Sequence, residues 1–358
     1  MMHAMPDPLD ALRPLVAGIA GLDHADRVRR GAALLSRAPR PPVGLTPHRI
    51  IHRQNKLCVR FYAPSGESTG VPVVVVPSMI NKAWICDLEP DRSLVGGLAE
   101  RGHPVYLVDW GVPGDEDAGQ TVADTLRLLQ RSIDRACRHA GAPQALLLGY
   151  CQGGTLATLL TALHPERVRG LSCFNTPVHF AHGGRFRRFV DASHLDVEAA
   201  FPADRLVPVA LMRAAFQLLD PMGVWQKHLA LERVADDPTR LRRSLARERW
   251  LEENVPMPGA FAQEFIAKTY QEDALMSGSW VVGGRRVDLS SITCPVQVTA
   301  SSRDPIAPPA SVLPLAELVG SDDVTVETLD TGHIGIVVGS FGPRVFFPRL
   351  DRWLRAHT

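Results

Sequence analysis

Residues 146–157 read LLLGYCQGGTLA and contain the pattern Gly-x-Cys-x-Gly, from Gly149 to Gly153. An apolar run ends at Gly149, Cys151 stands between small residues, and helix-forming residues follow. This pattern is typical of a sharp strand-to-helix turn that holds a nucleophile in a strained backbone conformation. A Cβ at either glycine would collide with neighbouring backbone, and the start of the helix favours thiolate over thiol. The stretch therefore predicts that Cys151 is a nucleophile at the end of a buried strand.

Other strand patterns surround this one in the sequence. Residues 71–79 and 104–110 precede it and 168–177 follow it, and these runs are rich in apolar residues, as buried parallel strands are. A helical pattern over 121–141 lies between two of the strands. This alternation predicts an α/β protein with a mostly parallel sheet flanked by helices.

The predicted domain organisation follows from where the alternation stops. Between 178 and 286 strand patterns give way to helical periodicity, and the sheet pattern returns at 294–304 and 323–333. We therefore predict one α/β core, formed by 48–177 and 287–358, with 178–286 inserted as a helical cap. An independent second domain is the alternative for that insertion.

The N-terminal residues 1–47 carry a different pattern. Apolar residues over 9–35 recur at helical spacing and predict a short amphipathic arm, and the Pro-rich 37–47 reads as a linker. The arm could contact a partner or pack on the core, and we expect packing.

Composition excludes several classes of function. The chain has 358 residues with 39 Lys and Arg against 38 Asp and Glu, a net charge of +1, so nucleic acid is a poor partner. The cysteines lack CxxC pairs and metal-type spacing, which argues against a disulfide scaffold or a metal site. No secretion signal is recognised and no apolar run approaches the roughly 18 residues of a membrane span. We expect a cytoplasmic protein without a transmembrane segment.

Two residues after Cys151 in the chain complete a catalytic pattern. Asp304 ends the strand-like 294–304 in SSRDPIAPP, where prolines force a loop, and His333 ends 323–333, just after the strand DVTVETLD and between Gly332 and Gly335. Nucleophile, acid and histidine in this order, each just past a strand, are typical of the α/β-hydrolase fold. Alone, each could be a core thiol, a turn residue or a solvated loop residue, and their joint occurrence favours the catalytic interpretation.

The same fold predicts where an oxyanion would be held. The backbone amide of Gln152 follows the nucleophile at the start of the helix, which makes it the first donor. The second donor comes from the loop after 71–79, and Ile80 in SMINK is our prediction for it.

Several further motifs follow one another along the chain. They are GYCQGG, YLVDWG (106–111), EPDRS (89–93), NTPV (175–178), DLSSITCPV (288–296), SSRDPIAPP and GHIGI (332–336). With these motifs the chain strongly resembles polyhydroxyalkanoate synthases over residues 50–356. Its length resembles that of the short class III catalytic subunits, and that of class IV subunits less closely.

The resemblance implies a function and roles for residues. Cys151 would be the acylated nucleophile and His333 its base, and Asp304, the third catalytic residue, would help to activate an incoming 3-hydroxyl group. The substrates would be (R)-3-hydroxyacyl-coenzyme A thioesters, the product a polyester with free coenzyme A, and no cofactor is implied. A sulfur nucleophile suits this chemistry, because thioester exchange keeps the growing end activated.

The resemblance also implies partners. The short subunits work with a second, different synthase subunit, and we expect homodimerisation and attachment to the polyester granule surface. The cytoplasmic location would then include granules.

Three positions depart from the family's pattern. His179 replaces the usual Asp after the TPV motif, Asp273 stands where Asn is expected in a YQxN-like segment, and Thr331 stands where Gly is common. None of them removes a catalytic residue. His179 and His182 lie near the start of the predicted cap, from where they could face the active-site pocket.

Two other functions use the same sequence features. A thioesterase or polyester hydrolase would share the catalytic residues and let water resolve the acyl-enzyme. A non-catalytic subunit would keep only the fold, and the presence of all three catalytic residues argues against it.

Overall fold

The computed structural model describes residues 22–219 and 223–358, which fall into two compact units. The larger unit comprises Val43–Met212 and Glu253–Thr358, and the smaller comprises Met1–Pro42 and Arg213–Glu252. The first part of the predicted arm, before residue 22, lies outside the described residues.

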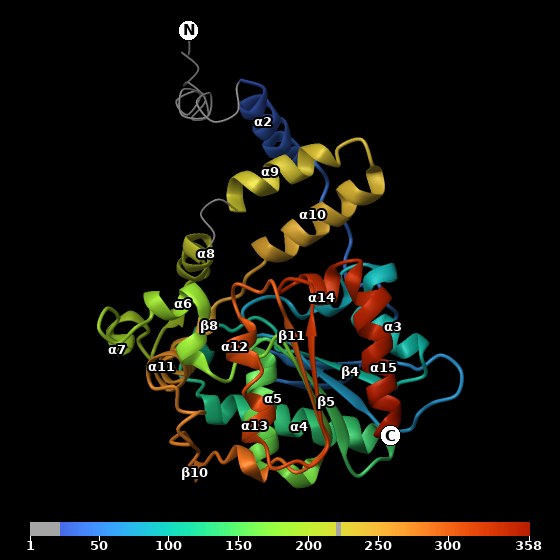
Figure 1. The fold of residues 1–358 in the computed structure, drawn as a ribbon, viewed down its shortest axis with the longest axis vertical. Coiled ribbons are helices and arrows are strands. Elements are labelled where there is room, and N and C mark those ends of the chain that lie inside the picture. Colours follow the sequence, from blue (N-terminus) through green and yellow to red (C-terminus); the bar gives the residue numbers. More distant parts are fainter. Residues whose placement is uncertain (1–21, 220–222) are drawn as a thin grey trace. The chain divides into compact units, whose positions relative to one another are not determined.

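The larger unit is built on a mostly parallel sheet, as the sequence predicted (Figure 1). Within the described residues this sheet has eight strands. Its first two strands pair antiparallel, and the remaining ones run parallel to one another. In spatial order the strands are β1 (Arg49–Gln54), β2 (Leu57–Tyr62), β4 (Val105–Asp109), β3 (Val73–Val76), β5 (Ala145–Tyr150), β6 (Val168–Phe174), β11 (Val296–Ser301) and β12 (Val324–Leu329).

Helices cover both faces of this sheet (Figure 1). Helices α3 and α15 lie on one face, and α4 and α5 lie on the other (Figure 1). The helical elements of the larger unit are η2 (Ala83–Asp87), η3 (Pro90–Arg92), α3 (Leu94–Glu100), η4 (Asp115–Asp117), α4 (Val122–Ala140), α5 (Gln152–Leu163), η5 (Pro165–Arg167), η6 (Phe180–His182), α6 (Gly184–Phe189), α7 (Val197–Ala200), α11 (Gly259–Ile266), η7 (Ala267–Gln271), η8 (Leu289–Ser291), α12 (Pro309–Val312), α13 (Leu315–Leu318), α14 (Gly335–Val338), η9 (Gly342–Phe346) and α15 (Phe347–Ala356).

Local sequence explains the elements next to the nucleophile. Helix α4 begins at a capping box, in which Thr121 and Asp124 bind each other's backbone N–H, and it ends at Gly141 with φ of 70°. Strands β3 and β5 are buried along their whole length, so their apolar runs show no alternation. These buried strands hold the loops that follow them at one edge of the sheet.

The segment predicted as a cap, residues 178–286, contains more than helices. The two-residue strands β7 (Leu206–Val207) and β8 (Met257–Pro258) pair antiparallel, and so do β9 (Val281–Val282) and β10 (Arg285–Arg286). Ladders of two residues are too short to leave an alternating pattern in the sequence, which is why none was predicted. The segment's middle part belongs to the smaller unit, and the cap boundaries stay a prediction.

The smaller unit joins the N-terminal helix to part of the insertion. Its helices are α2 (Leu22–Arg37), α9 (Gly223–Arg233) and α10 (Pro238–Glu252), and α8 (Val209–Leu219) continues into it from the residues of the larger unit. Helix α2 packs closely on α9, because Gly31 faces the carbonyl oxygen of His228 at a distance that leaves no room for a Cβ. The side chains of Arg27 and Arg30 each bind Glu232 at 3.0 Å.

The turn around the nucleophile has the steric constraint that the sequence predicted. Cys151 has a φ of 55° and a ψ of −132°, a strained conformation for a residue with a side chain. A Cβ on Gly149 would lie 2.3 Å from the Cα of Gly154, and one on Gly153 would lie 2.1 Å from the carbonyl oxygen of Val76. Both contacts are with backbone atoms, which have little freedom to move.

Replacing Gly153 with alanine is therefore expected to destabilise the protein. The new methyl group would press on the backbone after β3, and overpacking of this kind costs about 1–3 kcal/mol or more. The measurement is the free energy of unfolding in urea. The control is Gly119→Ala, whose Cβ meets nothing within 4 Å and which should change stability by less than about 0.5 kcal/mol. Equal effects of the two substitutions would contradict the steric account.

Candidate active site

Three loops at the carboxyl ends of parallel strands hold the predicted catalytic residues. Cys151 follows β5, Asp304 follows β11, and His333 follows β12. Cys151 is half-buried, whereas the side chain of His333 is 9 % exposed and that of Asp304 is fully buried. The structure brings all three together, because His333 interacts with both of the others.

His333 is oriented by Asp304. The Nδ1 atom of His333 lies 2.6 Å from Oδ2 of Asp304. The other carboxylate oxygen accepts the backbone N–H groups of Ile306 at 2.8 Å and Ala307 at 2.9 Å. Both oxygens of Asp304 are thus engaged, and the second ring nitrogen of His333, Nε2, is left to interact with Cys151.

The charge state of His333 follows from these neighbours. Burial lowers the pKa of His333, but the negative charge of a Cys151 thiolate, the hydrogen bonds with Asp304 and Cys151, and the charge of Asp304 together raise it to about 10. A histidine in this setting is protonated at neutral pH. The imidazolium places a positive charge beside Cys151, and the thiolate is the reactive form of a cysteine nucleophile.

Two further side chains fix the loop that carries His333. The hydroxyl of Tyr150 donates to the His333 carbonyl oxygen at 3.1 Å, and Nδ2 of Asn175 donates to the same oxygen at 2.9 Å. Thr331 is buried, and a Cβ on Gly335 would lie 2.6 Å from its hydroxyl oxygen. A role in holding this loop was not predicted for these residues, although Tyr150 and Asn175 stand in the GYCQGG and NTPV motifs.

Aromatic side chains gather around Tyr270 and form an apolar wall. The ring of Tyr270 packs against Phe180 at 4.8 Å and Phe186 at 4.9 Å between ring centroids. Burial and the negative charge that Cys151 carries as a thiolate raise the pKa of Tyr270. Tyr270 therefore keeps its phenolic proton at neutral pH. The sequence placed these aromatics in the cap without assigning them to the site.

The loop after β3 approaches the start of α5. The Oε1 atom of Gln152 accepts the N–H of Met79 at 3.0 Å and the hydroxyl of Ser78 at 3.3 Å. The N–H of Ile80 donates to Oγ of Ser78 at 3.2 Å, and the Ile80 carbonyl oxygen accepts from Val255. An oxyanion at the Ile80 amide would therefore have to displace the Ser78 hydroxyl. The N–H of Gln152 needs no such exchange, because the first amides of a helix have no partner within it.

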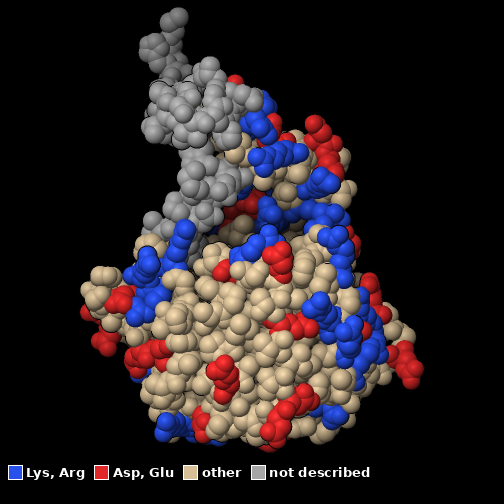
Figure 2. Space-filling view, viewed as in Figure 1, with Lys and Arg blue, Asp and Glu red and all other residues tan. Residues whose placement is uncertain are grey.

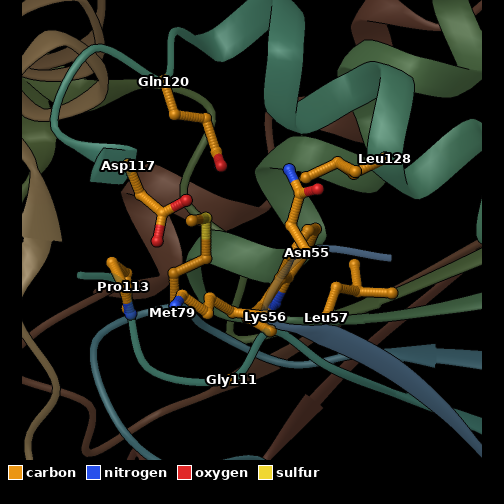
Figure 3. Close-up of a pocket in the computed structure, with 10 residues that line it drawn as sticks. Asn55, Lys56, Leu57, Met79, Gly111, Pro113, Asp117, Gln120 and Leu128 are labelled. Atoms are coloured by element: carbon orange, nitrogen blue, oxygen red, sulfur yellow. The ribbon is translucent and has the colours of Figure 1, made fainter. Parts of the chain in front are cut away.

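A small cavity lies on another side of the same loop (Figure 3). Its volume is about 20 Å³, and the side chain of Met79 points into it beside Asp117 and Gln120 (Figure 3). A cavity of this size has room for about one water molecule. It does not hold a substrate.

Two further findings concern metal ions and membranes in the part of the chain that the structure describes. There, no three His, Cys, Asp or Glu side chains gather in a way that could hold a metal ion. No helix among the described residues combines the length and apolarity that spanning a membrane requires. All cysteines are free thiols.

Comparisons with known proteins bear on the family and the fold of this chain. The family model described as "alpha/beta hydrolase fold" matches residues 71–340, and the model for the N-terminus of poly-beta-hydroxybutyrate polymerase (PhaC) matches residues 41–97. A poly(3-hydroxyalkanoate) polymerase subunit PhaC from Allochromatium vinosum is 31% identical over 97% of this chain and 99% of its own length. This chain belongs to the PhaC family.

Further PhaC relatives and solved structures extend the comparison. The polymerase subunit from Synechocystis is 30% identical over 87% of this chain and 85% of its own length, and that from Thiocystis violacea is 27% identical over 98% and 99%. A soluble variant of monoglyceride lipase from Saccharomyces cerevisiae has a TM-score of 0.57 at 14% identity, covering 90% of this chain and 99% of its own. The likeness to the lipase concerns the fold alone.

Two of the departures from the PhaC pattern contact each other. Nε2 of His179 lies 3.3 Å from Oδ2 of Asp273, and both side chains are largely buried. The Asp273 carboxylate also accepts the N–H of Phe180 at 2.7 Å and that of Ala181 at 3.4 Å. His179 thus faces the carboxylate of Asp273. In the family pattern the acidic side chain stands at position 179 and an amide stands at position 273.

This contact predicts that the two positions are energetically coupled. In His179→Asp, two carboxylates would face each other at short range, and we expect a loss of about 1 kcal/mol or more of stability. The double variant His179→Asp/Asp273→Asn should recover most of that loss. Urea unfolding of the two single variants and the double variant gives the coupling energy, and strictly additive effects would contradict the predicted coupling.

Proposed function

We propose that this chain is the catalytic subunit of a poly(3-hydroxyalkanoate) polymerase and that Cys151 carries the growing polyester. The substrates are (R)-3-hydroxyacyl-coenzyme A thioesters, and the reaction is acyl transfer. The observation that carries the proposal is the contact of His333 with both Cys151 and Asp304 in a chain of the PhaC family.

In the first half of the reaction the enzyme is acylated. The Cys151 thiolate attacks the carbonyl carbon of the thioester, a new C–S bond forms, and the C–S bond to coenzyme A breaks. The leaving thiolate takes the proton that the His333 imidazolium holds. The products are acyl-Cys151, neutral His333 and free coenzyme A.

In the second half the chain grows by one unit. The 3-hydroxyl group of another hydroxyacyl unit attacks the acyl-Cys151 carbonyl, His333 accepts its proton, and the Cys151 thiolate leaves as the ester bond forms. Asp304 stabilises the imidazolium that results and keeps Nδ1 toward itself, so it acts on the hydroxyl through His333.

The choice of sulfur follows from the energetics of these steps. Transfer from one thioester to another is nearly balanced in energy, so the acyl group stays activated on the enzyme. A serine ester at the same position would be a more stable oxoester, and the next hydroxyl would displace it poorly. The thioester substrate already supplies the activation, so the proposed reaction uses no cofactor.

The tetrahedral intermediates need hydrogen-bond donors. The N–H of Gln152 is the first donor, and the N–H of Ile80 becomes the second once it leaves Oγ of Ser78. The apolar wall of Phe180, Phe186 and Tyr270 keeps water away from the acyl-enzyme, which favours elongation over hydrolysis.

The assembly is a further part of the proposal. The length and motifs resemble those of class III subunits, so a second, different synthase subunit is the expected partner, together with homodimerisation. The polyester product would bring the complex to granule surfaces in the cytoplasm.

The test is an assay on (R)-3-hydroxybutyryl-coenzyme A with the chain alone and with a co-encoded candidate subunit. We expect coenzyme A release together with insoluble polyester, and more of both with the second subunit. Free 3-hydroxybutyrate without polymer would identify a thioesterase and contradict the proposal. Polymer formation by the complex that is unchanged in Cys151→Ala would identify a non-catalytic subunit.

A further inference from the structure

A basic pocket lies beside the candidate active site. It has a volume of about 520 Å³ and opens at the surface of α6, where Lys and Arg side chains gather (Figure 2). No acidic residue is among the residues that line it in the described part of the chain. The lining residues are Ala181, His182, Gly184, Arg185, Arg187, Arg188 and Pro305.

The pocket is joined to the catalytic residues through Pro305. This proline directly follows Asp304, whose carboxylate holds His333. Gly184 packs against it so closely that a Cβ would lie 2.5 Å from the Pro305 carbonyl oxygen, and its φ of +62° also favours glycine. The start of α6 is thereby fixed against the loop that carries Asp304.

Helix α6 carries both pocket-lining arginines and Phe186 of the apolar wall. Phe186 contacts Tyr270, whose pKa is raised by burial and by the charge of Cys151. Arg185 and Arg188 are three residues apart, which puts them on one face of the helix, and both are exposed. A helix with its side chains is about 10–12 Å across, so the basic face lies about that far from the wall.

The geometry points to this pocket as the site for the phosphate groups of the coenzyme A thioester. The inference rests on the proposed function. The phosphates of coenzyme A are separated from its sulfur by the pantetheine arm, so they must lie away from Cys151 while the thioester reaches it. Arginine suits them, because its planar guanidinium forms paired, charge-assisted hydrogen bonds with phosphate oxygens. Arg185 and Arg188 line the pocket and are exposed on α6, so they are the main test positions.

The first experiment compares two substrates that differ in the phosphates. One is (R)-3-hydroxybutyryl-coenzyme A and the other is its N-acetylcysteamine thioester, which keeps the acyl group and the sulfur. In Arg185→Ala/Arg188→Ala we expect the ratio of kcat/KM for the two substrates to fall about tenfold, mainly through KM for the coenzyme A thioester. In Arg188→Lys this ratio should fall less, because lysine keeps the positive charge.

Arg169→Ala is the matched control. Arg169 is an exposed arginine at the amino end of β6, at the opposite edge of the sheet, and its loss should leave the ratio unchanged. If the ratio is also unchanged in Arg185→Ala/Arg188→Ala, the inference is overturned and the polymerase proposal stays intact. An equal loss of activity on both substrates would also overturn the inference, because that indicates a structural role.

The second experiment measures binding without turnover. The Cys151→Ala protein is titrated by calorimetry with coenzyme A, dephospho-coenzyme A, pantetheine and inorganic phosphate. Coenzyme A should bind most tightly of the four. The Arg185→Ala/Arg188→Ala changes should weaken binding of coenzyme A about tenfold and leave that of pantetheine unaffected. Inorganic phosphate binding as tightly as coenzyme A, or binding of coenzyme A that ignores the arginines, would overturn the inference. This measurement stands even if the wild-type chain forms no polymer, so the two failures are distinguishable.

Discussion

Replacing Cys151 with serine is expected to slow polymer formation by a factor on the order of 10³ or more. A serine hydroxyl does not form an ion pair with His333 at neutral pH, so the attacking group is a neutral alcohol. Any acyl group that reaches it becomes an oxoester, which resists the next hydroxyl. The measurements are the initial rate of coenzyme A release and the mass of polymer formed.

Cys294→Ser is the control for this substitution. Cys294 is also a half-buried free thiol, but burial raises its pKa to about 11, so it stays a thiol at neutral pH. We expect activity within about twofold of the wild type, because Cys294 lies just before the amino end of β11, whereas the catalytic residues follow the carboxyl ends of their strands. A Cys151→Ser enzyme that polymerises at full speed would contradict the account.

Replacing His333 with glutamine is expected to cost a factor on the order of 10³–10⁴ in polymerisation. Glutamine can form hydrogen bonds but neither accepts the proton of the incoming hydroxyl nor carries the positive charge that stabilises the thiolate. In the wild type, the pKa of His333 is raised from 6.5 to about 10, so the imidazolium persists through this interval. The positive charge next to Cys151 is therefore kept at pH 7 and is lost only as the pH rises toward 10.

Alkylation by iodoacetamide separates this electrostatic effect from a loss of fold. At pH 7 the His333→Gln protein should react at Cys151 about tenfold or more slowly than the wild type, and its rate should rise with pH as for an ordinary thiol. Unchanged alkylation with lost polymerisation would mean that His333 does not set the charge of Cys151. The unfolding midpoint in urea serves as the check on folding.

The sequence was informative where chemistry imposes a local pattern. Strands β3 and β5 were predicted because they are buried on both faces, and the glycines around Cys151 because a tight turn excludes a Cβ. The order of Cys151, Asp304 and His333 at strand ends identified the residues that the fold brings together. Their catalytic roles stay a prediction until they are tested.

The features of the site that were not predicted depend on contacts between segments that are distant in the chain. Tyr270 lies more than a hundred residues after Cys151, and no spacing rule links the two. His179 and Asp273 were recognised as separate departures, and only the fold shows that they meet. The hydrogen bond from Ile80 to Ser78 is equally invisible in the sequence, because it depends on the path of a loop.

The most direct test of the central claim is to identify the atom that carries the acyl group. The chain is mixed with (R)-3-hydroxybutyryl-coenzyme A, quenched in acid, digested and examined by mass spectrometry. We predict a 3-hydroxybutyryl or oligomeric adduct on the peptide that contains Cys151, released by hydroxylamine and absent from Cys151→Ala. Polymer formation with the adduct on another residue, or with no covalent adduct at any time point, would contradict the account.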